Sequence, residues 1–104
     1  MEYRPLTLSS LISIRRLYSF HYFQFASGYL FPGEKHDFWE MVYIDRGEAE
    51  IGAGERVVRL SQGQVIFHEP NEFHSIWANY AHAPSIVVIT FACDSPGMRF
   101  FENR

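Results

Sequence analysis

The sequence predicts an all-β domain, built as a sandwich or small barrel of short antiparallel strands. From Leu17 onward the apolar residues are mainly Tyr, Phe, Ile, Val and Trp, which favour a pleated sheet over a helix. Short apolar stretches recur along the chain, and Gly, Pro, Asn or Asp closes each of them. The chain has 104 residues, of which 47% are hydrophobic, so residues 1–104 are expected to form a single domain with a sizeable core.

The expected strands follow the apolar stretches in order: 17–26, 28–31, 38–44, 48–51, 56–60, 65–68, 74–78 and 86–92. Glycine-containing turns at 52–54 and 61–64 separate the fourth, fifth and sixth of these strands, which is typical of hairpins. The Pro70-Asn71 pair closes the sixth strand before the seventh begins. Residues 1–15 settle on neither a helical nor a strand period and stay unassigned, and only the tail at 95–101 departs from the strand pattern.

Composition and charge exclude several classes of protein. The net charge is -3, and the one Lys and eight Arg are scattered, so the chain lacks the basic face that nucleic acids require. The single cysteine, Cys93, cannot form an internal disulfide and fits a reducing compartment. No apolar run approaches the roughly 20 residues that span a bilayer, and the N-terminus lacks a signal-peptide pattern. A cytoplasmic protein without membrane contacts is therefore expected.

Two segments, one hairpin apart, contain the side chains best suited to chemistry. They hold His36, Glu40 and His74, a set of two imidazoles and one carboxylate that binds first-row metals and leaves coordination positions open. On a straight strand His36 and Glu40 would lie roughly 13 Å apart, at about 3.3 Å per residue. The chain is therefore expected to turn at 37–38, so that one strand ends at His36 and the next begins near Trp39.

The same residues resemble the two motifs of the cupin fold. In the first motif, His36 is followed by three residues, Glu40, six residues and Gly47. The second motif is met at Gly63, Pro70 and His74. The resemblance implies a double-stranded β-helix, or jelly-roll barrel, of short antiparallel strands. Metal-dependent cupins carry a further His two residues before the first motif His, and this position is Glu34 here; a carboxylate can also be a metal ligand.

Longer sequence segments resemble a more specific family. The segments 33–40, 68–76 and 91–95 are similar to the N-terminal sensor domain of AraC-type transcription regulators, and the resemblance extends from about Phe20 to Phe101. In that family the cupin-like domain binds a small-molecule effector or dimerises, and a C-terminal pair of helix-turn-helix motifs binds DNA. The resemblance implies an effector-sensing homodimer that is not an enzyme and that contacts DNA only through a domain absent from this chain, which ends at Arg104.

Other interpretations of the site stay open. His36, Glu40 and His74 could form a buried hydrogen-bond network that requires no cofactor, or they could hold a divalent metal. His68 is expected to be a hydrogen-bonding group inside the barrel or at its rim, so the candidate ligand-binding residues are His36, Glu40, His68 and His74. Alternatives to the sensor function are a small metal-dependent cupin enzyme, an isomerase or dioxygenase, and a stand-alone cupin that binds a sugar or another small polar molecule.

Strand alternation predicts which side chains face outward. If Glu40 and His74 point into the barrel, five large side chains face the other way: Trp39, Met41, Tyr43, Phe73 and Trp77. Such a cluster is too large an apolar patch for a soluble monomer, so a dimer or interdomain surface, or the N-terminal arm, is expected to cover it. Glu69 and Glu72 are expected to lie in a solvated turn.

Overall fold

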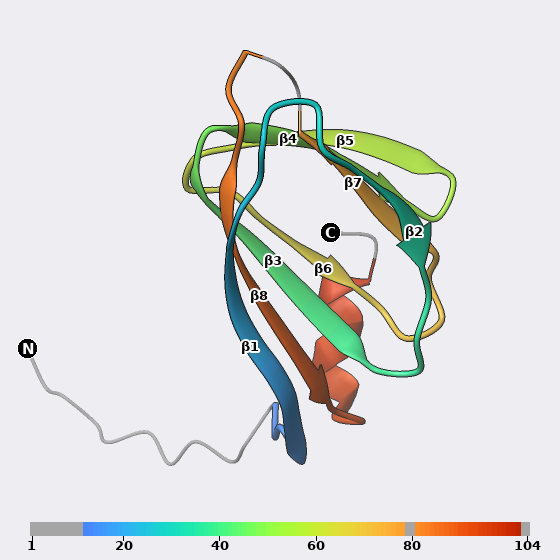
Figure 1. Ribbon diagram of the computed structural model, residues 1–104. Helices are drawn as coiled ribbons and strands as arrows, with labels where there is room; N and C mark the ends of the chain where they lie inside the picture. Colours follow the sequence, from blue (N-terminus) through green and yellow to red (C-terminus); the bar gives the residue numbers. More distant parts are fainter. Residues whose placement is uncertain (1–11, 79–80, 103–104) are drawn as a thin grey trace, which may run out of the picture.

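Two four-stranded antiparallel sheets face each other in the computed structural model, which describes residues 12–78 and 81–102 (Figure 1). One sheet has the strand order β1-β8-β3-β6, and the other has the order β2-β7-β4-β5. The strands are β1 Arg16–Gln24, β2 Leu30–Glu34, β3 Trp39–Arg46, β4 Glu48–Ala53, β5 Arg56–Ser61, β6 Val65–His68, β7 His74–Ala78 and β8 Ser85–Ala92. The predicted all-β class is therefore confirmed.

Each expected strand has a counterpart, but the second is displaced along the chain. The expected strand at 28–31 is wrong at its start, because Gly28 has a φ of 77° and lies in a turn. That turn is closed by the Tyr29 N–H, which donates to the Ala26 carbonyl over 3.1 Å. β2 therefore begins only at Leu30. Of the N-terminal arm that the sequence left unassigned, positions 1–11 lie outside the described residues.

A bulge extends β2 beyond its expected end. The pairing of β2 with β7 changes register between Phe31 and Glu34. Gly33, within this bulge, has a φ of 133°, and a Cβ at this position would lie 2.2 Å from the Phe73 ring. Glycine is thus required at this point by both conformation and space. As a result, Glu34 lies opposite His74, the first residue of β7.

The main core lies between the two sheets. On β3, Val42 and Ile44 are 4% and 0% exposed, which confirms that they face inward, as strand alternation predicted. Side chains from β4, β5, β6 and β8 complete this core: Ala49, Ile51, Ala53, Leu60, Ile66 and Ile86. The interior is apolar in this region, and the polar groups lie elsewhere along the same strands.

The last described residues pack on the other face of the β3 sheet. The tail forms η1, a 3-10 helix at Pro96–Phe101, which lies beside β3 and β8 (Figure 1). Met98 of this helix is buried together with Trp39 and Phe91 in a second, smaller core. No helix in the described ranges is long and apolar enough to cross a membrane.

Within the described part of the chain, β1 forms one edge of its sheet and pairs with β8 alone. Most of its side chains are exposed, and this includes large apolar ones: Leu17, Tyr18, Phe20, Tyr22 and Phe23. β1 is therefore held to the barrel mainly through its backbone pairing with β8.

Candidate functional site

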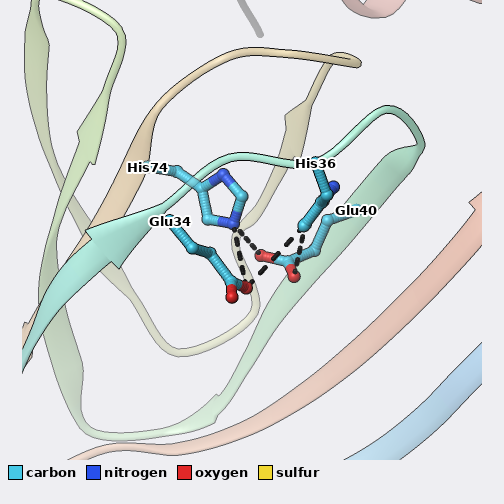
Figure 2. A group of neighbouring side chains, drawn as sticks. All are labelled: Glu34, His36, Glu40 and His74. Atoms are coloured by element: carbon cyan, nitrogen blue, oxygen red, sulfur yellow. Dashed lines mark ion pairs between the residues drawn. The ribbon is translucent and has the colours of Figure 1, made fainter.

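Four side chains converge between the two sheets (Figure 2). Glu34 ends β2, His36 lies in the turn that follows, Glu40 is the second residue of β3, and His74 begins β7. The candidate ligand atoms of these residues all lie within 4.8 Å of one another. The turn predicted at 37–38 is confirmed, because β2 ends before it and β3 starts directly after it.

The two imidazoles face the two carboxylates through their Nε2 atoms. His74 Nε2 lies 3.3 Å from Glu40 Oε2 and 3.6 Å from Glu34 Oε1. His36 Nε2 lies 3.6 Å from Glu40 Oε1 and 3.9 Å from Glu34 Oε1 (Figure 2). All three residues predicted as a metal set are thus brought together, and Glu34 joins them.

Backbone carbonyls orient both imidazole rings. His36 Nδ1 lies 2.9 Å from the Phe38 carbonyl oxygen, and His74 Nδ1 lies 3.0 Å from the Glu72 carbonyl oxygen. A carbonyl can only accept, so each Nδ1 carries a proton, and each Nε2 is the ring atom that faces the carboxylates. Both Nε2 atoms are buried, and among the described residues neither has a hydrogen-bond partner.

This arrangement fits a divalent cation. When both imidazoles present a lone pair at Nε2, these lone pairs and the carboxylates repel one another, and a shared cation converts this repulsion into coordination. Ligand atoms held at about 2.1 Å from one ion are separated by roughly 3–4 Å, and the four nitrogen–oxygen distances given above are 3.3–3.9 Å. If the rings are instead protonated at Nε2, the same atoms form ion pairs with Glu40, at 3.6 Å for His36 and 3.3 Å for His74, so the closed network among His36, Glu40 and His74 stays the alternative to a cation.

The carboxylates differ in their surroundings. Glu40 is 8% exposed, and burial raises its pKa; the neighbouring His74 and His36 act against this rise, whereas Glu34 adds to it. The Glu34 side chain is 49% exposed. The group therefore combines one desolvated carboxylate, which a cation would keep ionised, with one that reaches solvent.

His68 lies next to this group without belonging to it. Its ring stacks on the His74 ring with a centroid distance of 4.4 Å, and its Nδ1 lies 3.2 Å from Glu72 Oε1. The side chain is 1% exposed, and burial, followed by the charges of His74, His36 and Arg56, lowers its pKa to about 3. His68 is consequently neutral at pH 7, and its place inside the barrel agrees with the prediction of an interior hydrogen-bonding group.

The expectation of a solvated Glu72 is wrong. Its side chain is only 6% exposed. Asn71, with a φ of 66°, reverses the chain, and its N–H donates to the His36 carbonyl over 2.6 Å, which holds the loop against the site. The Glu72 carboxylate therefore faces His68, and burial raises its pKa. The four-residue spacing of His68 and Glu72 around the Pro70-Asn71 turn is the sequence signal that could have indicated this pair.

A cavity of about 390 Å³ adjoins the four-residue group. Glu34, Glu40, His68 and His74 contribute to its lining. The rest of the lining is mainly aromatic and aliphatic and includes Phe25, Tyr29, Phe31, Val42, Ile51 and Ile76. The cavity therefore joins a polar part, which contains candidate metal ligands, to an apolar part, as small-molecule sites commonly do.

The predicted outward residues do not form one surface. Trp39 is 4% exposed because η1 covers it through Met98, so the expectation that a partner or the N-terminal arm covers Trp39 is wrong. Met41 also packs against this second core, and Tyr43 is half-buried farther along β3. Phe73 and Trp77 belong to the other side of the barrel and are 51% and 43% exposed, so a dimer surface there stays a prediction.

Comparison with known proteins identifies the family to which this architecture is similar. The family model for the AraC-like ligand binding domain matches residues 16–86. None of the curated proteins matches the chain significantly.

Solved structures of cupin proteins resemble the chain. A cupin 2 conserved barrel domain protein from Rhodopseudomonas palustris is 21% identical, with a TM-score of 0.62 over 86% of this chain and 68% of that one. A predicted oxalate decarboxylase from Thermotoga maritima is 22% identical, with a TM-score of 0.66 over 73% and 67%. The polyketide cyclase RemF from Streptomyces resistomycificus is 14% identical, with a TM-score of 0.65 over 81% and 68%.

These likenesses confirm the cupin barrel and correct one expectation. The chain spans 50–68% of the length of the solved structures it resembles. The expectation that the domain is not an enzyme is wrong, because the fold does not support it. Solved structures named as a predicted decarboxylase and a cyclase have the same fold. The group of four candidate metal ligands is a second reason not to exclude an enzyme.

Proposed function

The chain belongs to the family of AraC-like ligand binding domains, and from that premise we propose that it is a sensor that binds a divalent cation and a small molecule side by side in its barrel. One observation carries this proposal. The buried Nε2 atoms of His36 and His74 have no hydrogen-bond partner among the described residues, and they share one space with two carboxylates beside the 390 Å³ cavity.

Glu34, His36, Glu40 and His74 would hold the cation. When bound there, a divalent cation supplies Lewis-acid polarisation and a coordination point for an oxygen or nitrogen atom of the small molecule. The Phe38 and Glu72 carbonyls fix the two imidazole rings before any cation arrives, so little side-chain freedom is lost on binding.

His68 is proposed to contact the small molecule directly. Glu72 accepts the proton of its Nδ1, so the neutral ring offers Nε2 as a hydrogen-bond acceptor where it lines the cavity. A hydroxyl or N–H group of the ligand next to the cation would donate to this atom. The apolar walls exclude water and strengthen both contacts.

The regulatory part of the proposal rests on β3. Glu40 lies in the site, while the neighbouring Trp39 packs against η1 on the opposite face of the strand. A shift of β3 on ligand binding would therefore reach the C-terminal end of the domain. In this proposal residues 1–104 form one effector-sensing domain of a cytoplasmic, homodimeric AraC-type regulator, and DNA is bound by a helix-turn-helix segment that would follow Arg104.

Titration of the chain with Zn²⁺ and with Mn²⁺, after purification without a nickel column, tests the central claim. We expect one ion per chain by calorimetry, and affinity reduced by roughly tenfold or more in His74→Ala and Glu40→Gln. His21→Ala, which removes an exposed imidazole on β1, is the control and should bind as the parent does. A folded chain that takes up neither ion would overturn the proposal, as would variants that bind like the parent.

The parent reading frame tests the regulatory part. Continuation beyond Arg104 into two helix-turn-helix motifs would support a transcription regulator, and a stop codon at that point would contradict it.

A metal-dependent cupin enzyme is the second candidate function. The observation that favours it is the His68–Glu72 pair beside the cation group, because a neutral imidazole whose ring is fixed by a carboxylate can orient a bound molecule next to a Lewis-acidic cation. Mass spectrometry of candidate ligands after incubation with the cation-loaded chain separates the two functions. A sensor returns its ligand unchanged, whereas an enzyme converts it and loses this conversion in His68→Gln.

A further inference from the structure

We infer that the ligand of this cavity is a planar aromatic compound that carries its oxygen donors at one end. The inference rests on the proposed function and adds to it the chemical class of the ligand. It follows from how polar and apolar groups are distributed along the cavity, from the arrangement of its aromatic rings and from the charges of its lining.

The polar and apolar residues of the lining are separated along the strands. On β3, Glu40 is followed two residues later by Val42, and on β7, His74 is followed by Ile76. Since residues two apart on a strand point to the same side, the cavity changes from polar to apolar in one step along each strand. A ligand that fills it must likewise have one polar end and an apolar body.

Three nearly parallel aromatic rings lie along the apolar part. The Phe23 and Phe25 rings have a centroid distance of 5.8 Å and an interplanar angle of 15°, and the Phe25 and Tyr29 rings have 4.6 Å and 18°. All three residues line the cavity. Strand pairing places Phe23 opposite Ile86, whose β3 partner is Ile44, so this row lies away from the Glu40 end.

A flat ring is the shape that best extends such a row. Aromatic rings attract one another in offset stacks with centroids about 4.5–7 Å apart, and the spacings within the existing row fall in this range. The cavity volume of about 390 Å³ lies in the lower part of the usual range for small-molecule sites, roughly 300–1,000 Å³. A compound of one to three rings is the corresponding size.

The charges of the lining define the polar end of the ligand. Two carboxylates, Glu34 and Glu40, face the cavity, and no Lys or Arg is part of the lining among the described residues. Phenolate or carboxylate oxygens of a ligand would be repelled here by two negative charges. A divalent cation cancels these charges and coordinates such oxygens, so the ligand and the cation are expected to depend on each other.

A sugar fits this cavity poorly. Its hydroxyl groups are distributed around the whole ring, and those that meet Ile51, Ile76 or Phe31 would lose their hydrogen bonds to water without replacement. Each such loss weakens binding by roughly tenfold. The earlier alternative of a sugar-binding cupin is therefore disfavoured relative to an aromatic ligand.

The experiment uses the Zn²⁺-loaded chain with three probes: 2,3-dihydroxynaphthalene, naphthalene and D-glucose. The readout is the ¹³C-methyl NMR shifts of Ile51, Ile76 and Ile86, which report on the cavity and do not require turnover. We expect 2,3-dihydroxynaphthalene to shift these methyl signals with at least tenfold higher affinity than glucose, and to lose at least tenfold in affinity when Zn²⁺ is left out. Naphthalene should bind weakly and equally with and without Zn²⁺.

A matched pair of variants on β1 locates the contact. Phe23→Ala removes a ring that lines the cavity and should weaken binding of 2,3-dihydroxynaphthalene several-fold. Phe20→Ala removes a ring that is 63% exposed and not part of the lining, and it should leave the affinity for this probe unchanged. Glucose that binds as well as the bicyclic probe, or equal effects of the two variants, would overturn the inference. A chain that binds Zn²⁺ but not the bicyclic probe overturns this inference alone, and a chain that does not bind Zn²⁺ overturns the proposed function with it.

Discussion

Trp39 and Glu40 are consecutive residues of β3 that serve different parts of the molecule. The Trp39 ring is 4% exposed and packs with Met98 of η1, while the Glu40 carboxylate lies 3.3 Å from His74 Nε2 on the opposite face. One peptide bond therefore separates the second core from the candidate cation site.

Met98→Ala should weaken the attachment of η1. The buried side chain fills the second core beside Trp39, so its truncation should lower the free energy of unfolding by roughly 2–3 kcal/mol. Phe100→Ala, on the same helix but 64% exposed, is the control and should change it by about 0.5 kcal/mol or less. Urea unfolding of both variants gives the measurement, and equal losses would contradict the packing of η1.

Cation binding should be visible at Trp39. The chain has two tryptophans, and Trp77→Phe removes the exposed one and leaves Trp39 as the single emitter. Titration of this variant with Zn²⁺ should shift the Trp39 emission in step with calorimetric binding, because coordination by Glu40 restrains the same strand. Emission that stays constant while Zn²⁺ binds would show that the site and η1 are not coupled.

His68 should make the metal-free protein less stable in acid. Its pKa is lowered from 6.5 to about 3 in the folded protein, so the unfolded chain takes up a proton between these values and the folded chain does not. Stability is therefore lost as pH falls from about 6.5 toward 3, by up to about 1.4 kcal/mol per pH unit. In His68→Gln, urea unfolding between pH 4.5 and 7.5 should give a flatter profile, whereas His21→Gln should keep the parent slope.

Glu72→Ala should destabilise the loop before β7. Removal of the carboxylate leaves the buried His68 Nδ1–H without its acceptor, which costs roughly 1–3 kcal/mol of unfolding free energy. Glu72→Gln retains an accepting oxygen and should recover most of this loss. Glu55→Ala, which removes an exposed carboxylate, serves as the reference. If thermal unfolding shows the same loss of stability for Glu72→Ala and Glu55→Ala, the His68–Glu72 hydrogen bond does not contribute as expected.

Gly33→Ala should disturb both the fold and the site. The added Cβ meets the Phe73 ring in a backbone conformation that favours glycine, so we expect a loss of about 3 kcal/mol or more and weaker Zn²⁺ binding through displacement of Glu34. Gly63→Ala also has a positive φ, 87°, but its Cβ would point into open space. It should therefore lose only about 1 kcal/mol and bind Zn²⁺ normally.

Most of the barrel could be predicted from local sequence. With Glu40 taken to point into the barrel, alternation on β3 correctly predicted that Val42 and Ile44 face inward, because a strand with one buried face repeats every two residues. The 37–38 turn followed from the distance that His36 and Glu40 must close. These features depend on residues near one another in the chain, which is why one sequence sufficed.

The rest depends on tertiary contacts that leave little trace in the sequence. Glu72 lies in a loop of polar residues, and its burial follows from the hydrogen bond between Asn71 and His36. The cover of Trp39 comes from a short 3-10 helix, an element without a reliable hydrophobic period. Strand alternation gave the direction of Trp39 correctly and could not identify what it would meet.

The edge position of β1 has a consequence for how this domain can change over time. β1 pairs with one neighbour, exposes most of its side chains, and still contributes Phe23 and Gln24 to the wall of the cavity. Substitutions at these two positions therefore alter what the ligand touches while leaving both cores intact. Ligand preference can drift, or be redesigned, through this strand alone, while the candidate metal ligands Glu34, Glu40 and His74 on β2, β3 and β7 remain as they are.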